Sequence, residues 1–268
     1  MLVADFNTPS ESLRQSIESI LMQTYEEFEV ILVDDGSKIS TSQRLADLRD
    51  SRIHIIENKR NLGFVGALRV GLAAVTGEYI VRLDPDDFVD KTYIETLVSA
   101  IRETPEFSVI SCCAQEFNSD GRLGPIIGKA GIKGRHEIAA GDCPIHPASI
   151  MRTADIIGVG GYPNYTRAED LALWCELLLH DMQLRVIPDV LYHYRVDDSD
   201  FAKRGISRRG GELKARLHYY PRLGVTPLEY LRIPKSILAG VLPGRLLRWY
   251  REHFGFGGKR RCARSNYA

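Results

Sequence analysis

The hydrophobic and polar positions of the first hundred residues alternate between two patterns. Short apolar runs such as "EVILVDDGS", "RIHIIEN" and "EYIVRL" end in polar turns, and between them lie stretches whose apolar residues recur every three or four positions. The first pattern is typical of buried strands and the second of helices. A β-α-β-α-β-α-β order of this kind predicts an α/β fold with a mostly parallel sheet flanked by helices.

The same patterns predict individual elements. After "LVADF", Thr8 as the cap, Pro9 and Glu11 predict a helix from about Pro9 to Gln23. Further along, "FSVISCCAQEF" predicts a strand, "TRAEDLALWCELLLHD" an amphipathic helix, and "LRVIP" with "VLYHYRV" a pair of strands.

Composition and charge exclude several classes of protein. The chain has 268 residues, is 44% hydrophobic, and balances 35 lysines and arginines with 35 aspartates and glutamates. These totals predict a globular protein without the overall charge that attracts nucleic acid. Its five cysteines show no Cys-x-x-Cys spacing, which argues against a zinc site or a disulfide framework and favours a reducing cytoplasm. The sequence shows no signal-peptide pattern and no apolar stretch of transmembrane length, so we expect a cytoplasmic location.

Two acidic clusters follow predicted strands. Asp34 and Asp35 follow one of them, and the segment Asp84-Pro85-Asp86-Asp87 follows another. Ligands of open α/β sheets bind beyond the carboxyl ends of the strands, so both clusters are expected to face one crevice. Carboxylates there suit Mg²⁺ or Mn²⁺ together with a phosphate substrate. The alternative is that these are turn residues and that Asp90 caps the next helix.

Three segments resemble the successive signatures of family 2 glycosyltransferases, which have the GT-A fold. They are "LRQSIESILMQTYEEFEVILVDDGS", "NLGFVGALRVGLAAVTGEYIVRLDPDD" and "AEDLALWCELL". The resemblance covers roughly residues 1–200 and implies a mostly parallel, Rossmann-like central sheet. We therefore expect a GT-A glycosyltransferase domain over residues 1–205 and a helical, basic C-terminal extension over residues 206–268.

The resemblance also implies roles for particular residues. Asp170 corresponds to the general base, and the acceptor side includes His146 and Glu169. The nucleotide sugar is expected to contact Asp34, Asp35, Asn61, Asp84 and Asp86, with Asp35 bound to the base, and Mg²⁺ or Mn²⁺ is expected on Asp86 and Asp87. Departures from the family pattern are Ala4-Asp5, where proline and a small hydroxyl residue are common, and Arg69, where asparagine is frequent. A capping box of Thr166 and Glu169 is the structural alternative for the "AED" segment.

The expected function is that of a metal-dependent, inverting glycosyltransferase of the hexosyltransferase type. It would move a sugar from a nucleotide diphosphate, with UDP-sugar favoured, to a hydroxyl of a polysaccharide, capsule or lipid-linked glycan. One alternative is a catalytically impaired module that still binds nucleotide sugar. Another is a nucleotidyltransferase, but "FNTPSES" lacks the glycine-rich basic loop that such an enzyme would show after its first strand.

The segment "SILAGVLPGRLLRWYREHFGFGGKRR" near the C terminus combines apolar residues with arginines and lysines. A basic amphipathic stretch of this kind can lie in the headgroup region of an anionic membrane, here the inner face of the cell membrane. An ordinary helix packed on the domain is the equally weighted alternative.

Overall fold

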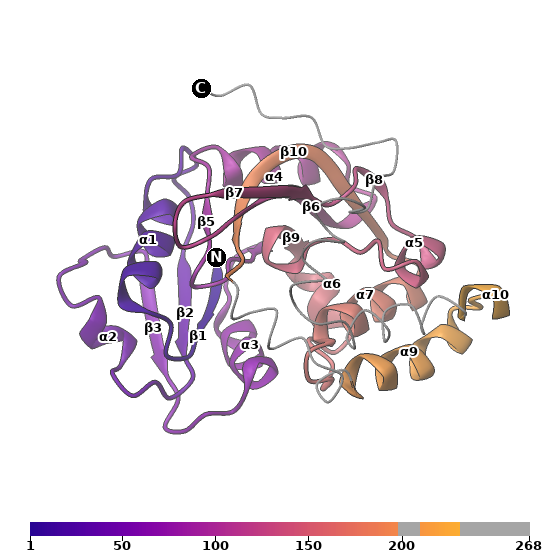
Figure 1. Cartoon of the computed structure of the whole chain (residues 1–268), viewed down its shortest axis with the longest axis horizontal. Coiled ribbons are helices and arrows are strands. Elements are labelled where there is room, and N and C mark those ends of the chain that lie inside the picture. The colour runs from indigo at the N-terminus through magenta and orange to yellow at the C-terminus, as the bar shows by residue number, and fades with distance from the viewer. Residues whose placement is uncertain (198–209, 231–268) are drawn as a thin grey trace.

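The computed structural model describes residues 1–197 and 210–230. Its first part shows the predicted alternation of strands and helices (Figure 1). The elements are β1 (Leu2–Asp5), α1 (Ser10–Leu21), β2 (Val30–Asp34), α2 (Thr41–Arg44), β3 (Ile53–Glu57), α3 (Phe64–Ala74) and β4 (Tyr79–Val81). Strands β1, β2 and β3 are parallel neighbours, with Leu2 opposite Ile31 and Asp5 opposite Asp34. The N-cap residue of α1 is Pro9 and no side chain caps the helix, so the predicted Thr8 cap is wrong.

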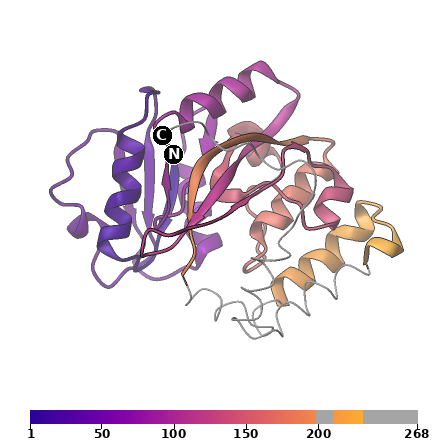
Figure 2. The ribbon, with the colours of Figure 1, turned by 45° about the horizontal axis from the view of Figure 1, so that its top comes forward.

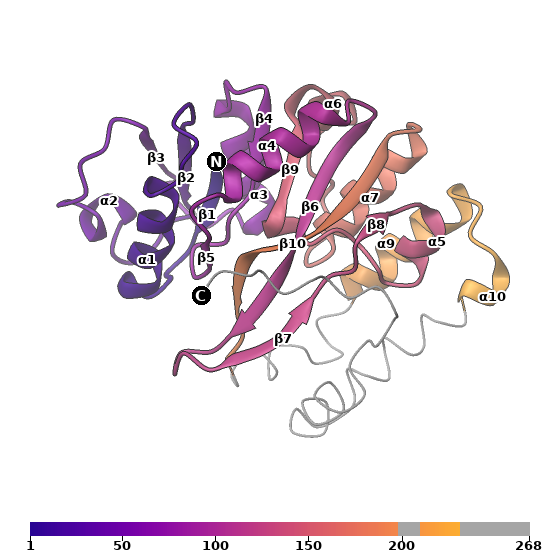
Figure 3. The same ribbon diagram turned by 90° about the horizontal axis from the view of Figure 1, so that it is seen from above.

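The rest of the sheet is mixed. It contains β5 (Phe88–Val89), β6 (Phe107–Phe117), β7 (Leu123–Ile127), β8 (Gly131–Ile132), β9 (Ser149–Arg152) and β10 (Gln183–Arg195). The strand order is β4-β9-β6-β10-β5, with β7 on β6 and β8 on β10, as the view from above shows (Figure 3). A parallel bridge between Leu2 and Arg82 joins β1 to the end of β4. "LRVIP" and "VLYHYRV" are not paired strands as predicted, because both belong to β10, which runs along β6 with shifts in register.

The remaining helices lie mostly in the second half of the chain. They are α4 (Tyr93–Glu103), α5 (Arg135–Ala139), the 3₁₀ helix η1 (His146–Ala148), α6 (Thr153–Gly158), α7 (Glu169–Leu179), α9 (Gly210–Arg222) and α10 (Pro227–Tyr230). Helix α9 packs beside α7 (Figure 2), and the Tyr219 hydroxyl donates to Glu176 at 2.8 Å. Both α9 and α10 belong to the expected extension, whereas the basic amphipathic tail lies outside the described residues.

Alternate residues of the central strands enter two separate cores. Leu2 and Ala4 of β1 pack on the side of α3 and α7, and Val3 packs on the side of α1 and α4. The same alternation continues through β2, as expected for a strand whose successive side chains point to opposite faces. Two covered faces leave the strand ends as the place where polar residues gather. Within residues 1–197 and 210–230, no helix has both the length and the apolar character needed to cross a bilayer.

Candidate active site

The two acidic clusters lie at one edge of the sheet. Asp34 is the last residue of β2 and Asp35 follows it, and Asp84 and Asp86 lie in the loop after β4. Only β1 separates these two parallel strands, and the Leu2–Arg82 bridge holds β4 against it. The topology therefore brings both clusters to the same edge of the sheet, and a crevice common to them stays a prediction.

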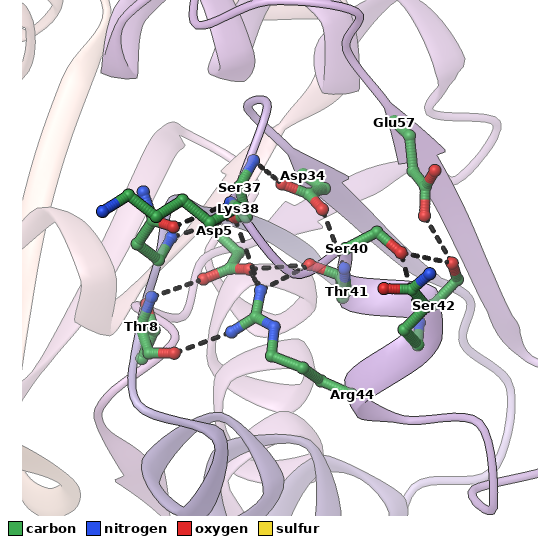
Figure 4. A network of polar contacts seen from close by, with 12 residues as sticks. Asp5, Thr8, Asp34, Ser37, Lys38, Ser40, Thr41, Ser42, Arg44 and Glu57 are labelled. Carbon is green, nitrogen blue, oxygen red and sulfur yellow. Dashed lines mark hydrogen bonds and ion pairs between the residues drawn. The ribbon is translucent and has the colours of Figure 1, made fainter.

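A buried polar network fixes the loop between β2 and α2 (Figure 4). Asp5 forms an ion pair with Arg44 and accepts a hydrogen bond from the Thr41 hydroxyl at 2.6 Å. Asp34 accepts from the backbone amides of Ser37 and Thr41, both at 2.8 Å. Burial opposes ionisation of Asp34, but these hydrogen bonds hold its pKa below the usual value. Each oxygen of Asp34 accepts one hydrogen bond inside the loop, and its predicted contact with the nucleotide stays a prediction.

Asp35 ties the end of β2 to the start of α3. Its Oδ1 accepts from the Leu62 amide at 2.8 Å and from Asn58 Nδ2 at 2.9 Å, and its Oδ2 accepts from the Gly63 amide at 2.8 Å. A carboxylate oxygen has room for about two donors. Oδ2 can therefore accept one further N–H, as a nucleobase would offer. Asn61 is exposed beside it and accepts from the same Gly63 amide at 3.0 Å.

The acidic loop after β4 is balanced by a buried cation that the sequence reasoning missed. Arg82 is fully buried, and its Nη2 lies 2.5 Å from Asp84 Oδ1. Its Nη1 donates to the carbonyl oxygens of Leu2 at 2.9 Å and Leu83 at 3.1 Å. The signal was present in the sequence, because an arginine interrupts the apolar strand "EYIVRL" two positions before the first aspartate.

Asp87 points into the protein and not toward the crevice. It is 2% exposed, and it accepts from the Tyr192 hydroxyl at 2.6 Å and from the Arg195 amide at 2.7 Å. Burial, followed by the charges of Asp84 and Asp86, raises its pKa well above the usual value. Both of its oxygens accept hydrogen bonds from the chain, which favours Asp84 and Asp86 over Asp87 as metal ligands, and the predicted role of Asp87 stays a prediction. Arg195, also missed, donates from Nε to the Asp86 carbonyl at 2.9 Å.

Asp84 and Asp86 are partly exposed in the same short turn. Within residues 1–197 and 210–230, no three histidine, cysteine, aspartate or glutamate side chains gather closely enough to hold a metal by themselves. Mg²⁺ is commonly held by one or two carboxylates together with the phosphates of a substrate. The two carboxylates fit that type of divalent-cation site, which the bound donor would complete.

Two neighbouring residues have structural roles instead. His193 Nε2 lies 2.7 Å from Asp90 Oδ1, and its ring stacks on Phe88 with centroids 4.3 Å apart. Helix α4 begins after Thr92 without a side-chain cap. The prediction that Asp90 caps this helix is therefore wrong, because its carboxylate is bound to the histidine of β10.

The start of α7 presents two adjacent carboxyl groups. Its N-cap is Ala168 with no side-chain cap, so the alternative capping box of Thr166 and Glu169 does not form. Glu169 is 8% exposed, and within the described chain its Oε2 has no hydrogen-bond partner. Burial, with the charge of Asp170, raises the pKa of Glu169 to about 7. Asp170 accepts from the Leu171 amide at 2.7 Å, and its pKa is also raised, mainly by burial.

His146 packs against the same helix, α7. It is 4% exposed, its Nε2 is 3.1 Å from the Tyr162 hydroxyl, and its ring packs edge-on against Trp174. Burial and the charge of Arg82 lower its pKa well below the usual value, so it is neutral at neutral pH. Its side chain is therefore held inside the protein by Tyr162 and Trp174, and the predicted place of His146 on the acceptor side stays a prediction.

The pKa of Glu169 predicts a pH-dependent stability. Since its folded-state pKa of about 7 exceeds the usual 4.5, the folded protein binds more protons than the unfolded chain between these values. Stability from this residue is full below pH 4.5 and is lost as pH rises through 7. Between pH 4.5 and pH 7, the free energy of unfolding of the wild type, relative to that of a Glu169→Gln variant, should fall by up to about 3 kcal/mol. Urea titrations at several pH values measure this, with the exposed Glu78→Gln as control, and parallel curves for wild type and Glu169→Gln would contradict it.

Comparison with known proteins shows that this chain matches a protein family. A family model described as "Glycosyl transferase family 2" matches residues 2–149. The chain is 27% identical over 251 residues to the protein EpsE of Bacillus subtilis (strain 168), an alignment that spans 90% of this chain and 88% of EpsE. It is 28% identical over 225 residues to "UDP-Gal:alpha-D-GlcNAc-diphosphoundecaprenol beta-1,3-galactosyltransferase" of Escherichia coli, covering 78% of each chain.

A solved structure shows the same architecture. The mannosyltransferase PcManGT from Pyrobaculum calidifontis, solved with GDP-Man and Mn²⁺, matches with a TM-score of 0.65 at 16% identity. The match covers 92% of this chain and 76% of that one. Together with the family match, this likeness confirms the predicted GT-A fold.

Proposed function

Because the chain belongs to glycosyl transferase family 2, we propose that it is a metal-dependent, inverting hexosyltransferase. The family makes it a glycosyltransferase that uses a nucleotide-sugar donor. The metal, the inversion and the hexose are the parts that we propose. They are supported by the partly exposed Asp84 and Asp86 on one side and by Glu169 and Asp170 on the other.

One observation carries the proposal. The charge of Asp84 contributes to the raised pKa of both Glu169 and Asp170, so the loop after β4 and the start of α7 lie within electrostatic reach of each other. Arg82 supplies the balancing cation, since it pairs with Asp84 and its charge lowers the pKa of Glu169. Carboxylates brought together around a crevice with perturbed pKa values are typical of catalytic sites.

The proposed chemistry assigns a task to each carboxylate. Asp35 Oδ2 accepts a base N–H, and Asp84 and Asp86 bind the ribose and the divalent ion. Mg²⁺ or Mn²⁺, when bound, supplies Lewis-acid stabilisation for the leaving nucleoside diphosphate. Asp170 takes the proton of the acceptor hydroxyl while the acceptor oxygen bonds to the anomeric carbon from the face opposite the departing diphosphate. Attack from that face inverts the anomeric centre.

We further propose a UDP-sugar as donor and a polysaccharide or lipid-linked glycan as acceptor. The printed name of the Escherichia coli relative, which states a UDP-sugar donor and a diphospholipid-linked acceptor, supports both. Such an acceptor would place the reaction at the cytoplasmic face of a membrane. The basic tail proposed to contact that membrane lies outside the described residues.

Thermal unfolding with and without ligands tests the donor and metal sites. UDP with Mn²⁺, at about one hundred times its dissociation constant, should raise the melting temperature by about 5 °C, because it binds only the folded state. Asp86→Asn should lose the Mn²⁺-dependent part of this shift, while Asp189→Asn, an exposed aspartate on β10, should keep it. If UDP alone raised the melting temperature as much as UDP with Mn²⁺ does, in both variants, the result would argue against the metal.

A further inference from the structure

Helix α9 lies along α7 (Figure 1), and it also reaches the segment that leads into that helix. This segment, residues 162–168, contains no helix or strand. The Tyr219 ring of α9 lies 5.7 Å from the Tyr165 ring of the segment, centroid to centroid, and the Tyr219 hydroxyl donates to Glu176 of α7. One side chain of α9 thus contacts both α7 and the segment before it.

Gly211 brings the backbone of α9 onto the same segment. A β-carbon at this position would overlap the Thr166 carbonyl oxygen and would lie 3.1 Å from the carbonyl carbon. The φ of Gly211 is not positive, so its backbone conformation suits any residue, and glycine costs a helix about 1 kcal/mol relative to alanine. Close approach to Thr166 is therefore the feature that needs glycine here.

The segment that Gly211 contacts does not hold itself in place. Arg167 has a φ of 63°, a conformation that costs a residue with a β-carbon about 1–3 kcal/mol and persists only where the surrounding structure imposes it. The N-cap of α7 is Ala168, and no side chain caps the helix. Contacts from other elements therefore have to support the first turn of α7, and α9 supplies such contacts.

The start of α9 also lies within electrostatic reach of Asp170. Burial raises the pKa of Asp170, and the charge of Glu212, the residue after Gly211, adds to the rise. Glu212 pairs with Arg216 one turn along α9 at 2.9 Å. A displacement of α9 would therefore change both the support of the first turn of α7 and the charge around Asp170.

We propose that Gly211 is a positioning residue, whose contact with the Thr166 carbonyl lets α9 hold the first turn of α7, and with it Asp170, in place for proton transfer. Gly211 is assigned no contact with donor or acceptor and acts through the segment before Asp170. This inference rests on the proposed function, because that function makes Asp170 the base. Helix α9 of the C-terminal extension is then part of the catalytic unit.

Hydrogen exchange of the full chain tests the positioning without any substrate. The Ala172 amide donates to the Ala168 carbonyl at 2.9 Å, so its exchange rate reports opening of the first turn of α7. Gly211→Ala should speed this exchange by about tenfold or more, because the added methyl group forces α9 away from Thr166.

Gly210→Ala is the matched control. It changes helix propensity in the same way, but among the described residues no atom lies within 4 Å of a β-carbon at Gly210. The exchange of Ala172 should therefore stay as in the wild type. The Ile31 amide, which donates to the Met1 carbonyl at 2.8 Å, reports opening of the sheet and should be unchanged in both variants.

Turnover tests the consequence for the reaction. UDP-galactose and UDP-N-acetylglucosamine are supplied with Mn²⁺ and with water as the acceptor. Asp170 then takes a proton from water while the water oxygen bonds to the anomeric carbon and UDP leaves. Since a misplacement of about 1 Å can cost about 100-fold in rate, kcat should fall by about tenfold or more in Gly211→Ala. It should stay within about twofold of the wild type in Gly210→Ala.

UDP binding separates a misplaced base from a loss of folded protein. The dissociation constant of UDP, measured by calorimetry, should stay within about twofold of the wild type in both glycine variants. The stoichiometry of the same titration counts the folded molecules and corrects kcat for them. If Gly211→Ala does not fold, Tyr165→Leu replaces it, because it removes the ring contact with Tyr219 and adds no bulk. The same local exchange and the same loss of kcat are expected.

Four results would overturn the inference. They are unchanged exchange at Ala172, equal effects of the two glycine substitutions, equal acceleration at Ile31, and an undiminished kcat in Gly211→Ala. The proposed function fails in a different way. A wild type that turns over neither UDP-sugar would overturn that function, and the catalytic role of Gly211 with it, even where the exchange of Ala172 responds as expected.

Discussion

Replacing Asp170 with asparagine is expected to lower kcat by about 100- to 10,000-fold, the usual contribution of a general base. Asparagine keeps the size of the side chain but cannot take the proton of the acceptor hydroxyl. Asp170 lies at the start of α7, and burial raises its pKa, which suits a carboxylate that must accept a proton near neutral pH. Turnover of UDP-sugars and calorimetric titration with UDP measure the two effects separately.

UDP affinity should stay within about threefold of the wild type, because Asp170 is not assigned to the donor. Asp181→Asn is a matched control, since Asp181 follows the end of α7 in a left-handed conformation that asparagine tolerates. Retained turnover in the Asp170 variant would remove this residue from the mechanism. A wild type that binds UDP without turning over any UDP-sugar would favour the impaired binding module.

Replacing Arg82 with methionine is expected to lower the free energy of unfolding by about 3–5 kcal/mol, the usual cost of removing one partner of a buried ion pair. Methionine fills much of the space, but it leaves Asp84 without its partner and near Glu169 and Asp170. It also removes the hydrogen bond to the Leu2 carbonyl, which joins the end of β4 to β1, and the bond to the neighbouring Leu83 carbonyl. Urea-induced unfolding measures the change.

A double-mutant cycle separates the ion pair from packing. If the pair carries the effect, Arg82→Met combined with Asp84→Asn should be less destabilised than the sum of the two single variants, by at least about 1 kcal/mol. Arg49→Met, at an exposed position, should change the free energy of unfolding by no more than about 0.5 kcal/mol. Additive losses in the cycle would show that Arg82 acts through packing and its carbonyl contacts alone.

Residue patterns predicted most of the fold. Apolar runs identified β2, β3, β4 and β6, and helical spacing identified α1, α3 and α7. Spacing could not show how distant segments meet, so β10 was mistaken for two strands that pair with each other. The hydrophobic period of a segment reports which of its faces is buried, but it carries no information about which strand lies beside it.

The candidate site divides in the same way. Strand ends placed Asp35, Asp84 and Asp86 at one edge, because parallel strands bring their carboxyl ends together whatever follows them. Whether a carboxylate there is open depended on partners from elsewhere in the chain. Asp87 was sealed by Tyr192 and Arg195, which are more than one hundred positions away.

The sequence by itself determined most of the strands and helices, the acidic edge and the family, because these follow from local periodicity and from the order of motifs. Tertiary structure alone decided that Asp34 and Asp87 are internal, that Arg82 balances the acidic loop, and that a buried oxygen of Glu169 has no hydrogen-bond partner within the described residues. The physical reason is that the charge state and the hydrogen bonds of a side chain depend on its burial and on the nearest atoms in space. Folding brings those atoms together from residues that are far apart in the sequence, and the spacing of residues along the chain does not reveal such contacts.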